Sequence, residues 1–167
     1  VLEQIRRFAQ ANPGRDVIRG HGWTQFTFDG LQPHRTWLDT VTDVRPAFLH
    51  SYEVHDVWAN MAAFLAAGIG PDTPDPNPPT SYWPRDPDGF PAGTCCEPEA
   101  WLPIAIELGM FSMESVREAM ALTMAPAPSW GITSYYDAST LLTSRRLVGD
   151  AYEPVIGLAR AGELPVR

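Results

Sequence analysis

The segment RPAFLHSYEVHDVWANMAAFLAAGIG, residues 45–70, decides the fold class of this chain. Its first part, residues 45–52, is a nearly unbroken apolar run, which is typical of a strand covered on both faces of a parallel sheet. Its second part, residues 56–68, has the apolar spacing of an amphipathic helix, with Asp56 in a capping position and Gly68 at the expected end. The segment therefore predicts a strand followed directly by a helix.

Helices and short strands alternate on both sides of this segment. Residues 1–12 predict an amphipathic helix, and residues 16–23 predict a buried strand after it. Further along, Ser112 is expected to cap a helix that ends before Pro126, and residues 131–139 follow as a third strand. This order indicates an α/β fold with a parallel sheet, either doubly wound or part of a (β/α)8 barrel. Two more helices are predicted, at residues 36–42 and 150–162.

Proline divides the chain into three parts. Ten of the 17 prolines lie in residues 71–103, where they argue against a long helix or a central strand. We therefore predict barrel β/α units at residues 1–70 and 104–167, separated by a proline-rich insertion at 71–103 with a hairpin that turns at Asp88-Gly89. Two interpretations of the insertion stay open: a lid or subunit contact, and a proline-stiffened surface loop.

Composition excludes several classes of partner. The chain has 167 residues with a formal charge of −8 and no cluster of basic residues, so nucleic acid is not an expected partner. No apolar run approaches the roughly 20 residues of a membrane span. All 12 basic residues are arginine, which excludes lysine chemistry from this stretch. The two cysteines, Cys95 and Cys96, are adjacent and cannot join distant parts of the fold, which favours a reducing, cytoplasmic setting.

Candidate site residues follow the predicted strands, because working groups in parallel folds project from the carboxyl ends of strands. This criterion selects His21 and Trp23 after the first strand, Glu53 and His55 after the second, and Asp137 after the third. Each of three candidates also has a structural interpretation. His55 could be a neighbour of the helix end that bonds the backbone, Trp23 could belong to the core, and Asp137 could cap the following loop. His21, His55 and Asp137 could be drawn as a metal site, but no pair has ligand spacing on a helix or strand.

The two other histidines have structural interpretations. His50 alternates with Phe48 and Tyr52 and is predicted to be hydrogen-bonded within the sheet. His34 stands beside Pro33 in a loop and is predicted to be solvated.

Five blocks of the sequence occur in a fixed order that spans nearly the whole chain. They are VIRGHGWTQ (17–25), RTWLDTVTDVRPAFLHSYEVHDVWAN (35–60), AAGI (66–69), RDPDGFPAG (85–93) and GITSYYDA (131–138). Together they resemble the YtcJ-like amidohydrolases, also called amidohydrolase family 3. The corresponding family patterns include G-x-G-W, D-G-H-x-x-W-x-N, R-D-x-x-G-x-P-T-G and G-I-T-S-x-x-D.

The resemblance implies a metal-dependent hydrolase on a (β/α)8 barrel that cleaves amide or related C–N bonds of a small-molecule substrate. A divalent metal, expected to be zinc, would activate the attacking water. The family's H-x-H metal motif and its later ligand motifs are absent from this sequence. We therefore expect an internal segment, starting without methionine, that is inert by itself because the metal ligands lie outside it. Unpaired sheet edges would allow a homo-oligomer if the segment folds alone.

The same mapping gives His55 and Trp23 their roles. His55 occupies the histidine of D-G-H-x-x-W-x-N and Trp23 the tryptophan of G-x-G-W, which implies positions in the substrate pocket. A neutral His55 would donate a hydrogen bond to the substrate carbonyl or the developing oxyanion, within reach of Glu53. Glu53-Val54 and Ala92 depart from the family's Asp-Gly and Thr. A non-catalytic ligand-binding or structural module is the alternative.

Overall fold

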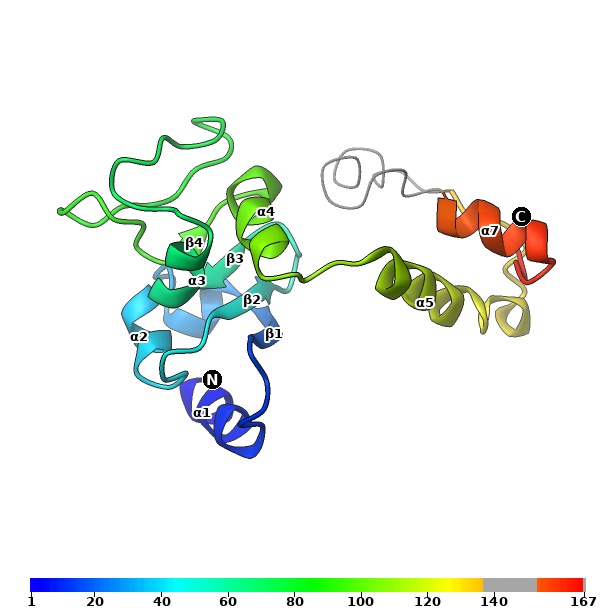
Figure 1. Cartoon of the computed structure of the whole chain (residues 1–167), viewed down its shortest axis with the longest axis horizontal. Coiled ribbons are helices and arrows are strands. Elements are labelled where there is room, and N and C mark those ends of the chain that lie inside the picture. The colour runs from blue at the N-terminus through cyan, green and yellow to red at the C-terminus, as the bar shows by residue number, and fades with distance from the viewer. Residues whose placement is uncertain (137–152, 167) are drawn as a thin grey trace. The chain divides into compact units, whose positions relative to one another are not determined.

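The computed structural model describes residues 1–136 and 153–166. The chain forms two compact units, Val1–Leu108 and Gly109–Arg167 (Figure 1). We refer to them as unit 1 and unit 2 and describe each by itself.

Unit 1 is built on a four-stranded sheet in the order β1-β2-β3-β4. The strands are β1 (Ile18–Trp23), β2 (Ala47–Ser51), β3 (Val57–Ala59) and β4 (Thr94–Cys95). The pair β1–β2 is parallel, as predicted, with Ile18 opposite Ala47 and His21 opposite His50. The pairs β2–β3 and β3–β4 are antiparallel. The α/β class is therefore confirmed, but the sheet is mixed and not purely parallel.

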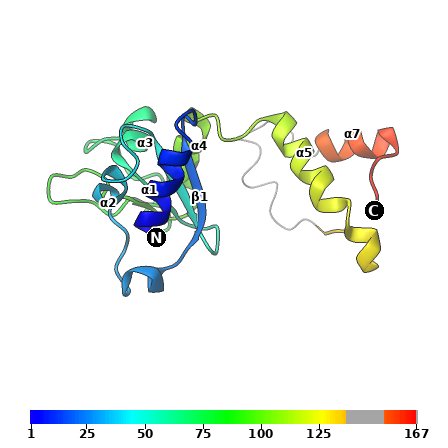
Figure 2. The same cartoon turned by 90° about the horizontal axis from the view of Figure 1, so that it is seen from below.

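Helices cover the sheet of unit 1, as Figures 1 and 2 show. They are α1 (Leu2–Ala11), α2 (Arg35–Asp39), α3 (Met61–Ala66) and α4 (Pro98–Glu107). The 3-10 helix η1 (Gln25–Phe28) lies in the connection between β1 and α2. Helices α1 and α2 share one hydrophobic core with β1, β2 and β3, because the apolar side chains of these elements point to the same side. This core contains Ile5, Ala9, Ile18, Trp23, Leu38, Val41, Ala47, Leu49 and Trp58.

The prediction of one helix from Asp56 to Gly68 is wrong in its first part. Val57–Ala59 is strand β3, and all three of its residues are completely buried. The chain turns sharply after β2 and pairs back on it, with Phe48 opposite Ala59. Burial on both faces together with ladder hydrogen bonds decides for a strand here, because helix propensity is a weak preference that tertiary context overrides.

Helix α3 begins one residue after Asn60, which takes the capping role predicted for Asp56. The Asn60 side chain is completely buried, and its Oδ1 accepts hydrogen bonds from the backbone N–H groups of Ala63 and Ala47 at 3.0 and 2.9 Å. Its Nδ2 donates to Thr42 Oγ1 at 3.0 Å and to the Arg45 carbonyl at 2.9 Å. One amide therefore connects the start of α3, the start of β2 and the loop before β2.

Residues 71–103 carry many internal polar contacts. Arg85 is opposite Pro91 in an antiparallel bridge, and a turn between them is closed by a hydrogen bond from Gly89 N–H to the Asp86 carbonyl at 2.9 Å. The Arg85 guanidinium donates to the carbonyls of Gly89 and Thr73 at 2.8 and 2.6 Å. Because these acceptors are backbone carbonyls from separate parts of the loop, Arg85 holds the loop in one shape.

The prediction that proline excludes a long helix from residues 71–103 is wrong for α4, which runs from Pro98 to Glu107. Pro98 occupies the first turn, where a missing N–H costs nothing. Pro103 lies inside the helix, where proline ordinarily costs about 3 kcal/mol. Burial of Ala100, Trp101, Leu102, Ile104 and Ala105 offsets this cost.

Unit 2 contains α5 (Met113–Met124), the 3-10 helix η2 (Ala127–Trp130) and α7 (Glu153–Ala161). The predicted cap is confirmed: Ser112 Oγ accepts from Ser115 N–H at 3.0 Å, within a capping box. No strand occurs at residues 131–136, which are the described part of the predicted third strand, and Gly131 ends η2 there in a left-handed conformation. The predicted cap at Asp150 lies outside the described residues.

Within the parts of the chain that the structure describes, no helix has the length and apolar character needed to cross a membrane.

Replacement of Asn60 by alanine is expected to lower the free energy of unfolding by about 3–4 kcal/mol, because it leaves buried backbone groups without partners and removes a helix cap. Urea denaturation followed by tryptophan fluorescence measures this loss. The matched control is Asn12→Ala, whose half-buried side chain donates to the Phe8 carbonyl. Equal losses in the two variants would contradict the role given to Asn60.

Candidate functional site

The carboxyl ends of β1 and β2 lie side by side because the two strands are parallel. The backbone N–H of Tyr52 donates to the carbonyl of Trp23 at 2.8 Å, which joins the two ends. The rings of His21 and Tyr52 have centroids 6.4 Å apart. The turn between β2 and β3, residues 52–56, therefore starts beside the end of β1. It carries two of the candidate residues, Glu53 and His55, on its exposed side.

His55 is held in this turn by contacts to the start of α4. Its Nδ1 lies 3.0 Å from Glu97 Oε2, and its carbonyl accepts a hydrogen bond from Trp101 Nε1 at 2.9 Å. The next residue, Asp56, accepts the backbone N–H of Glu97 at 3.2 Å. The His55 side chain is 66% exposed. The imidazole is thus anchored at one nitrogen while much of its surface stays open to solvent.

Two residues of this turn, His55 and Asp56, have shifted pKa values. The hydrogen bond to Glu97, and then the charge of Glu97, raise the pKa of His55 above its ordinary value. Burial raises the pKa of Asp56, because a charged carboxylate loses hydration there. The shift of His55 favours the imidazolium near neutral pH.

Two residues at this contact have unusual backbone angles. Val54 has φ 65°, and Glu97 has φ 67° with ψ 161°, a combination that almost only glycine adopts. Each such residue costs about 1–3 kcal/mol. The exposed His55–Glu97 pair returns only about 0–1 kcal/mol. The contact between the turn and α4 therefore stores backbone strain.

His21 and Trp23 face a cleft of about 270 Å³ that is also lined by residues of α1, among them Ile5 and Phe8. Trp23 is only 5% exposed, and its indole N–H donates to the Leu49 carbonyl at 2.7 Å. Glu53 and His55 are not among the residues that line this cleft. The structure thus brings the first two candidates together in the cleft and the other two together in the turn. Asp137 lies outside the described residues.

His50 differs from its predicted environment. Its Nδ1 is buried without a hydrogen-bond partner, and its ring meets the Trp101 ring edge-on with centroids 5.0 Å apart. Burial, and then the charge of His21, lower the pKa of His50. The neutral ring therefore serves as an aromatic packing element of β2, and the prediction of a hydrogen-bonded sheet histidine is wrong for Nδ1.

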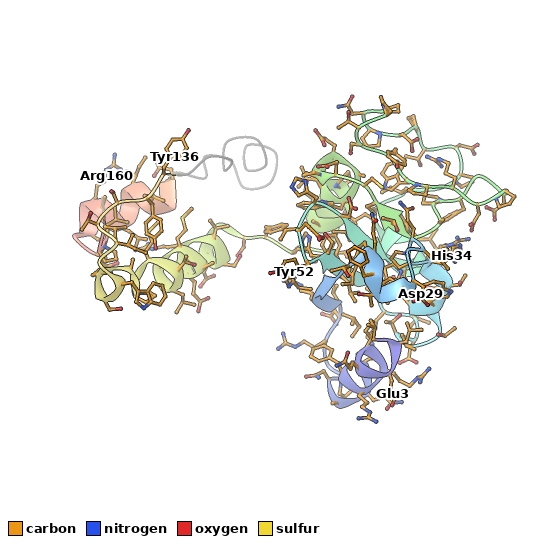
Figure 3. All side chains as sticks on the ribbon, turned by 180° about the vertical axis from the view of Figure 1, so that it is seen from behind. Glu3, Asp29, His34, Tyr52, Tyr136 and Arg160 are labelled. Atoms are coloured by element: carbon orange, nitrogen blue, oxygen red, sulfur yellow. The ribbon has the colours of Figure 1, made fainter. Side chains whose placement is uncertain are left out.

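The Arg-Asp motif at residues 85–86 contributes to the structure, because Asp86 joins the hairpin to the start of α2. Asp86 accepts hydrogen bonds from His34 Nε2 at 2.9 Å and from the buried guanidinium of Arg35. His34 also accepts the N–H of Thr36 and so caps α2, which corrects its prediction as a solvated loop residue. Figure 3 shows His34 and Tyr52 on opposite sides of unit 1. The Asp86 cluster is therefore separate from the His55 turn.

Gly93 of the same motif region allows the close contact between the hairpin and α2. It has φ 140°, and a Cβ at this position would lie 2.4 Å from the backbone nitrogen of Arg35. The Arg35 guanidinium in turn stacks on the Phe90 ring at 5.1 Å. Residues 85–93 are therefore held against α2 in two ways. The Asp86 carboxylate pairs with Arg35, and the absence of a side chain at Gly93 lets the two backbones approach.

Sequence reasoning did not find Glu97. It lies 42 positions after His55, and no spacing rule connects a turn with a helix start so far along the chain. The one local signal is an acid directly before the proline that opens α4.

Comparison with known proteins places the chain. The family model described as "Amidohydrolase family" matches residues 1–167. The chain belongs to the amidohydrolase family. It is 27% identical to the exoenzymes regulatory protein AepA of Pectobacterium carotovorum subsp. carotovorum, over 98% of this chain and 34% of that protein. The amidohydrolase chain thus spans about a third of the length of this relative.

Two solved structures resemble the amidohydrolase chain in fold. One is an uncharacterized metal-dependent hydrolase from Pyrococcus horikoshii OT3, with a TM-score of 0.55 and 18% identity over 99% of this chain and 29% of that one. The other is an uncharacterized metal-dependent hydrolase from Pyrococcus furiosus, with a TM-score of 0.50 and 20% identity over 99% of this chain and 30% of that one.

Replacement of Asp86 by asparagine is expected to destabilise unit 1 by about 2 kcal/mol, because it leaves the Arg35 guanidinium without its counter-charge. This is less than the ~3–5 kcal/mol of a fully buried pair, since 22% of the Asp86 side chain is exposed. Asp88→Asn is the control: Asp88 lies in the same hairpin, is exposed, and accepts the Phe90 N–H, which asparagine can also do.

The effect of Asp86→Asn is also expected to depend on pH. Burial would raise the pKa of Asp86, but hydrogen bonds from His34 and Arg35 outweigh it and hold this pKa below its ordinary value. A lowered carboxyl pKa stabilises the fold above the unfolded value, and this contribution is lost as the pH falls through the folded value. Urea denaturation in a pH series should show the difference from wild type shrinking in acid. A constant difference would contradict this assignment.

Proposed function

We propose that this chain is a segment of a YtcJ-like, metal-dependent amidohydrolase that hydrolyses amide or related C–N bonds of a small-molecule substrate. The observation that carries the proposal is the match of the amidohydrolase family model to residues 1–167. The fold likeness to two metal-dependent hydrolases supports it. In the whole enzyme, β1 and β2 would belong to a (β/α)8 barrel, whose active sites lie at the carboxyl ends of the strands.

The metal of this enzyme would be divalent, with zinc as the expected ion. Among residues 1–136 and 153–166, no group of three or more His, Cys, Asp or Glu side chains could hold a metal ion. The described residues therefore do not form a complete metal site by themselves. We propose that the ligands belong to other parts of the protein and that this segment is catalytically inert by itself.

The substrate side of the site would include His55, Glu53, His21 and Trp23. His55 is the strongest candidate, because its imidazole is anchored at Nδ1 and exposed elsewhere. Anchoring fixes the direction of the ring, and exposure leaves its other nitrogen free for a hydrogen bond with a substrate oxygen. Trp23 would form part of the wall of the site, since its indole is buried and donates a hydrogen bond to the Leu49 carbonyl of β2.

The proposal predicts where metal and activity reside. The complete gene product should bind divalent metal stoichiometrically, measured by inductively coupled plasma mass spectrometry, and release amine from a panel of N-acyl and N-formyl substrates. The 167-residue chain alone should do neither. Chelation followed by zinc addition is the control for metal dependence. Stoichiometric metal and hydrolysis in the chain alone, or a complete product without metal, would refute the proposal.

The role of His55 predicts a second result. His55→Asn in the complete gene product should lower kcat by about 10²–10³ while metal content and melting temperature stay near those of wild type, because one oxyanion-directed donor is lost. His34→Asn serves as a matched histidine control on the other side of unit 1, and it should lower stability and leave kcat per folded molecule intact. Unchanged kcat in His55→Asn, or a loss explained by lost metal, would remove His55 from the pocket.

A regulatory protein is the second candidate, and the observation that favours it is the name of the relative AepA, an exoenzymes regulatory protein. A non-catalytic module of this kind would bind a small ligand without hydrolysing it. The metal and activity measurements above separate the two candidates.

A further inference from the structure

The hydrogen bond to Glu97 decides which nitrogen of His55 carries a proton. A carboxylate only accepts hydrogen bonds, so Nδ1 of His55 must be the donor across the 3.0 Å contact. In the neutral ring, Nε2 then has a lone pair and no hydrogen. The neutral imidazole expected from sequence therefore cannot donate from Nε2, and only the imidazolium can.

Glu97 keeps this position at a cost to its backbone. Its φ of 67° and ψ of 161° suit glycine, yet the residue carries a side chain that reaches His55. Its backbone N–H bond to Asp56 would persist with glycine in its place. What glycine would lose is the carboxylate. The pairing with His55 is therefore the one contact in the described residues that requires glutamate here.

We propose that Glu97 is a positioning residue for His55: it holds the ring as the Nδ1–H form and presents Nε2–H of the imidazolium to a carbonyl or oxyanion of the substrate. This inference rests on the proposed function, since it names how the same pocket residue acts. Glu97 itself touches no reacting atom. The charged groups that act on the His55 ring are Glu97, Asp56 and Glu53, and all three favour the imidazolium.

Nitrogen-15 NMR of the complete gene product, with labelled histidine, tests the pairing without any need for activity. The spectrum of His55→Asn assigns the signal of His55 among the histidines. The wild type should show the Nδ1–H tautomer and a raised pKa. Glu97→Gln should lower that pKa towards the ordinary value and shift the ring towards the Nε2–H tautomer. The control is Glu99→Gln, an exposed acid in the first turn of α4, which should leave His55 unchanged.

Kinetics of the complete gene product test the consequence. Glu97→Gln should lower kcat on the order of tenfold, with a smaller change in KM, because a partner that orients a histidine has this scale of effect. The alkaline limb of kcat/KM should move to lower pH, because His55 loses its proton earlier. Glu99→Gln should keep the wild-type profile.

A stability measurement separates positioning from structure. Glu97→Gly should melt at or above the temperature of wild type, because glycine relieves the strain, while its turnover falls with that of Glu97→Gln. A large drop in melting temperature in Glu97→Gly would show that glutamate is kept for the fold and would overturn the inference.

The remaining outcomes are also decisive. An unchanged His55 titration and tautomer in Glu97→Gln would overturn the inference, because Glu97 would then not control the protonation of the ring. An active wild type whose Glu97→Gln variant keeps kcat and the pH limb would refute the role of Glu97 and leave the proposed function standing. A complete gene product that hydrolyses no amide would refute the proposed function, whatever the ring does.

Discussion

The buried amide of Asn60 is the contact on which unit 1 depends. Its side chain is completely buried, satisfies backbone groups of β2 and α3, and reaches the loop before β2. A buried backbone group without a partner costs about 1–3 kcal/mol, so a start of α3 that left these groups unpaired would be disfavoured. The position of Asn60 therefore sets where β3 ends and where the helix begins, and through β3 it sets the turn that carries His55.

The turn itself shows how packing and chemistry compete. The buried ring of Trp101 bonds the carbonyl of His55, and the start of α4 bonds the Asp56 side chain. These contacts fix the turn tightly enough to keep Val54 and Glu97 in left-handed conformations. Strain of this kind persists only where the surroundings over-determine the backbone, which is common at functional sites. Here the sheet and α4 are the surroundings that hold the strained backbone in place.

The family motifs divide into two groups in the structure. The Trp and Asn of D-G-H-x-x-W-x-N are core residues: Trp58 is completely buried and donates to the His34 carbonyl, and Asn60 is the buried amide. The R-D-x-x-G-x-P motif docks the proline-rich loop through Arg85 and Asp86. The histidine of the first motif is the exposed exception. The motif residues Trp58, Asn60, Arg85 and Asp86 thus stabilise the fold, whereas His55 is exposed on its surface.

Local sequence was sufficient for the elements whose stability is local. The helix at residues 2–11, the capped helix after Ser112 and the parallel strand pair follow from periodicity and capping residues, because these signals act within a few positions. The carboxyl-end rule selected His21 and Trp23, which lie in the last part of β1, and His55, which lies in the turn after β2; their roles stay predictions. Only the tertiary structure decided that Val57–Ala59 is a strand, that Glu97 meets His55 and that His34 meets Asp86. These contacts join positions far apart in the chain, and their free energy comes from burial and pairing that no local pattern encodes.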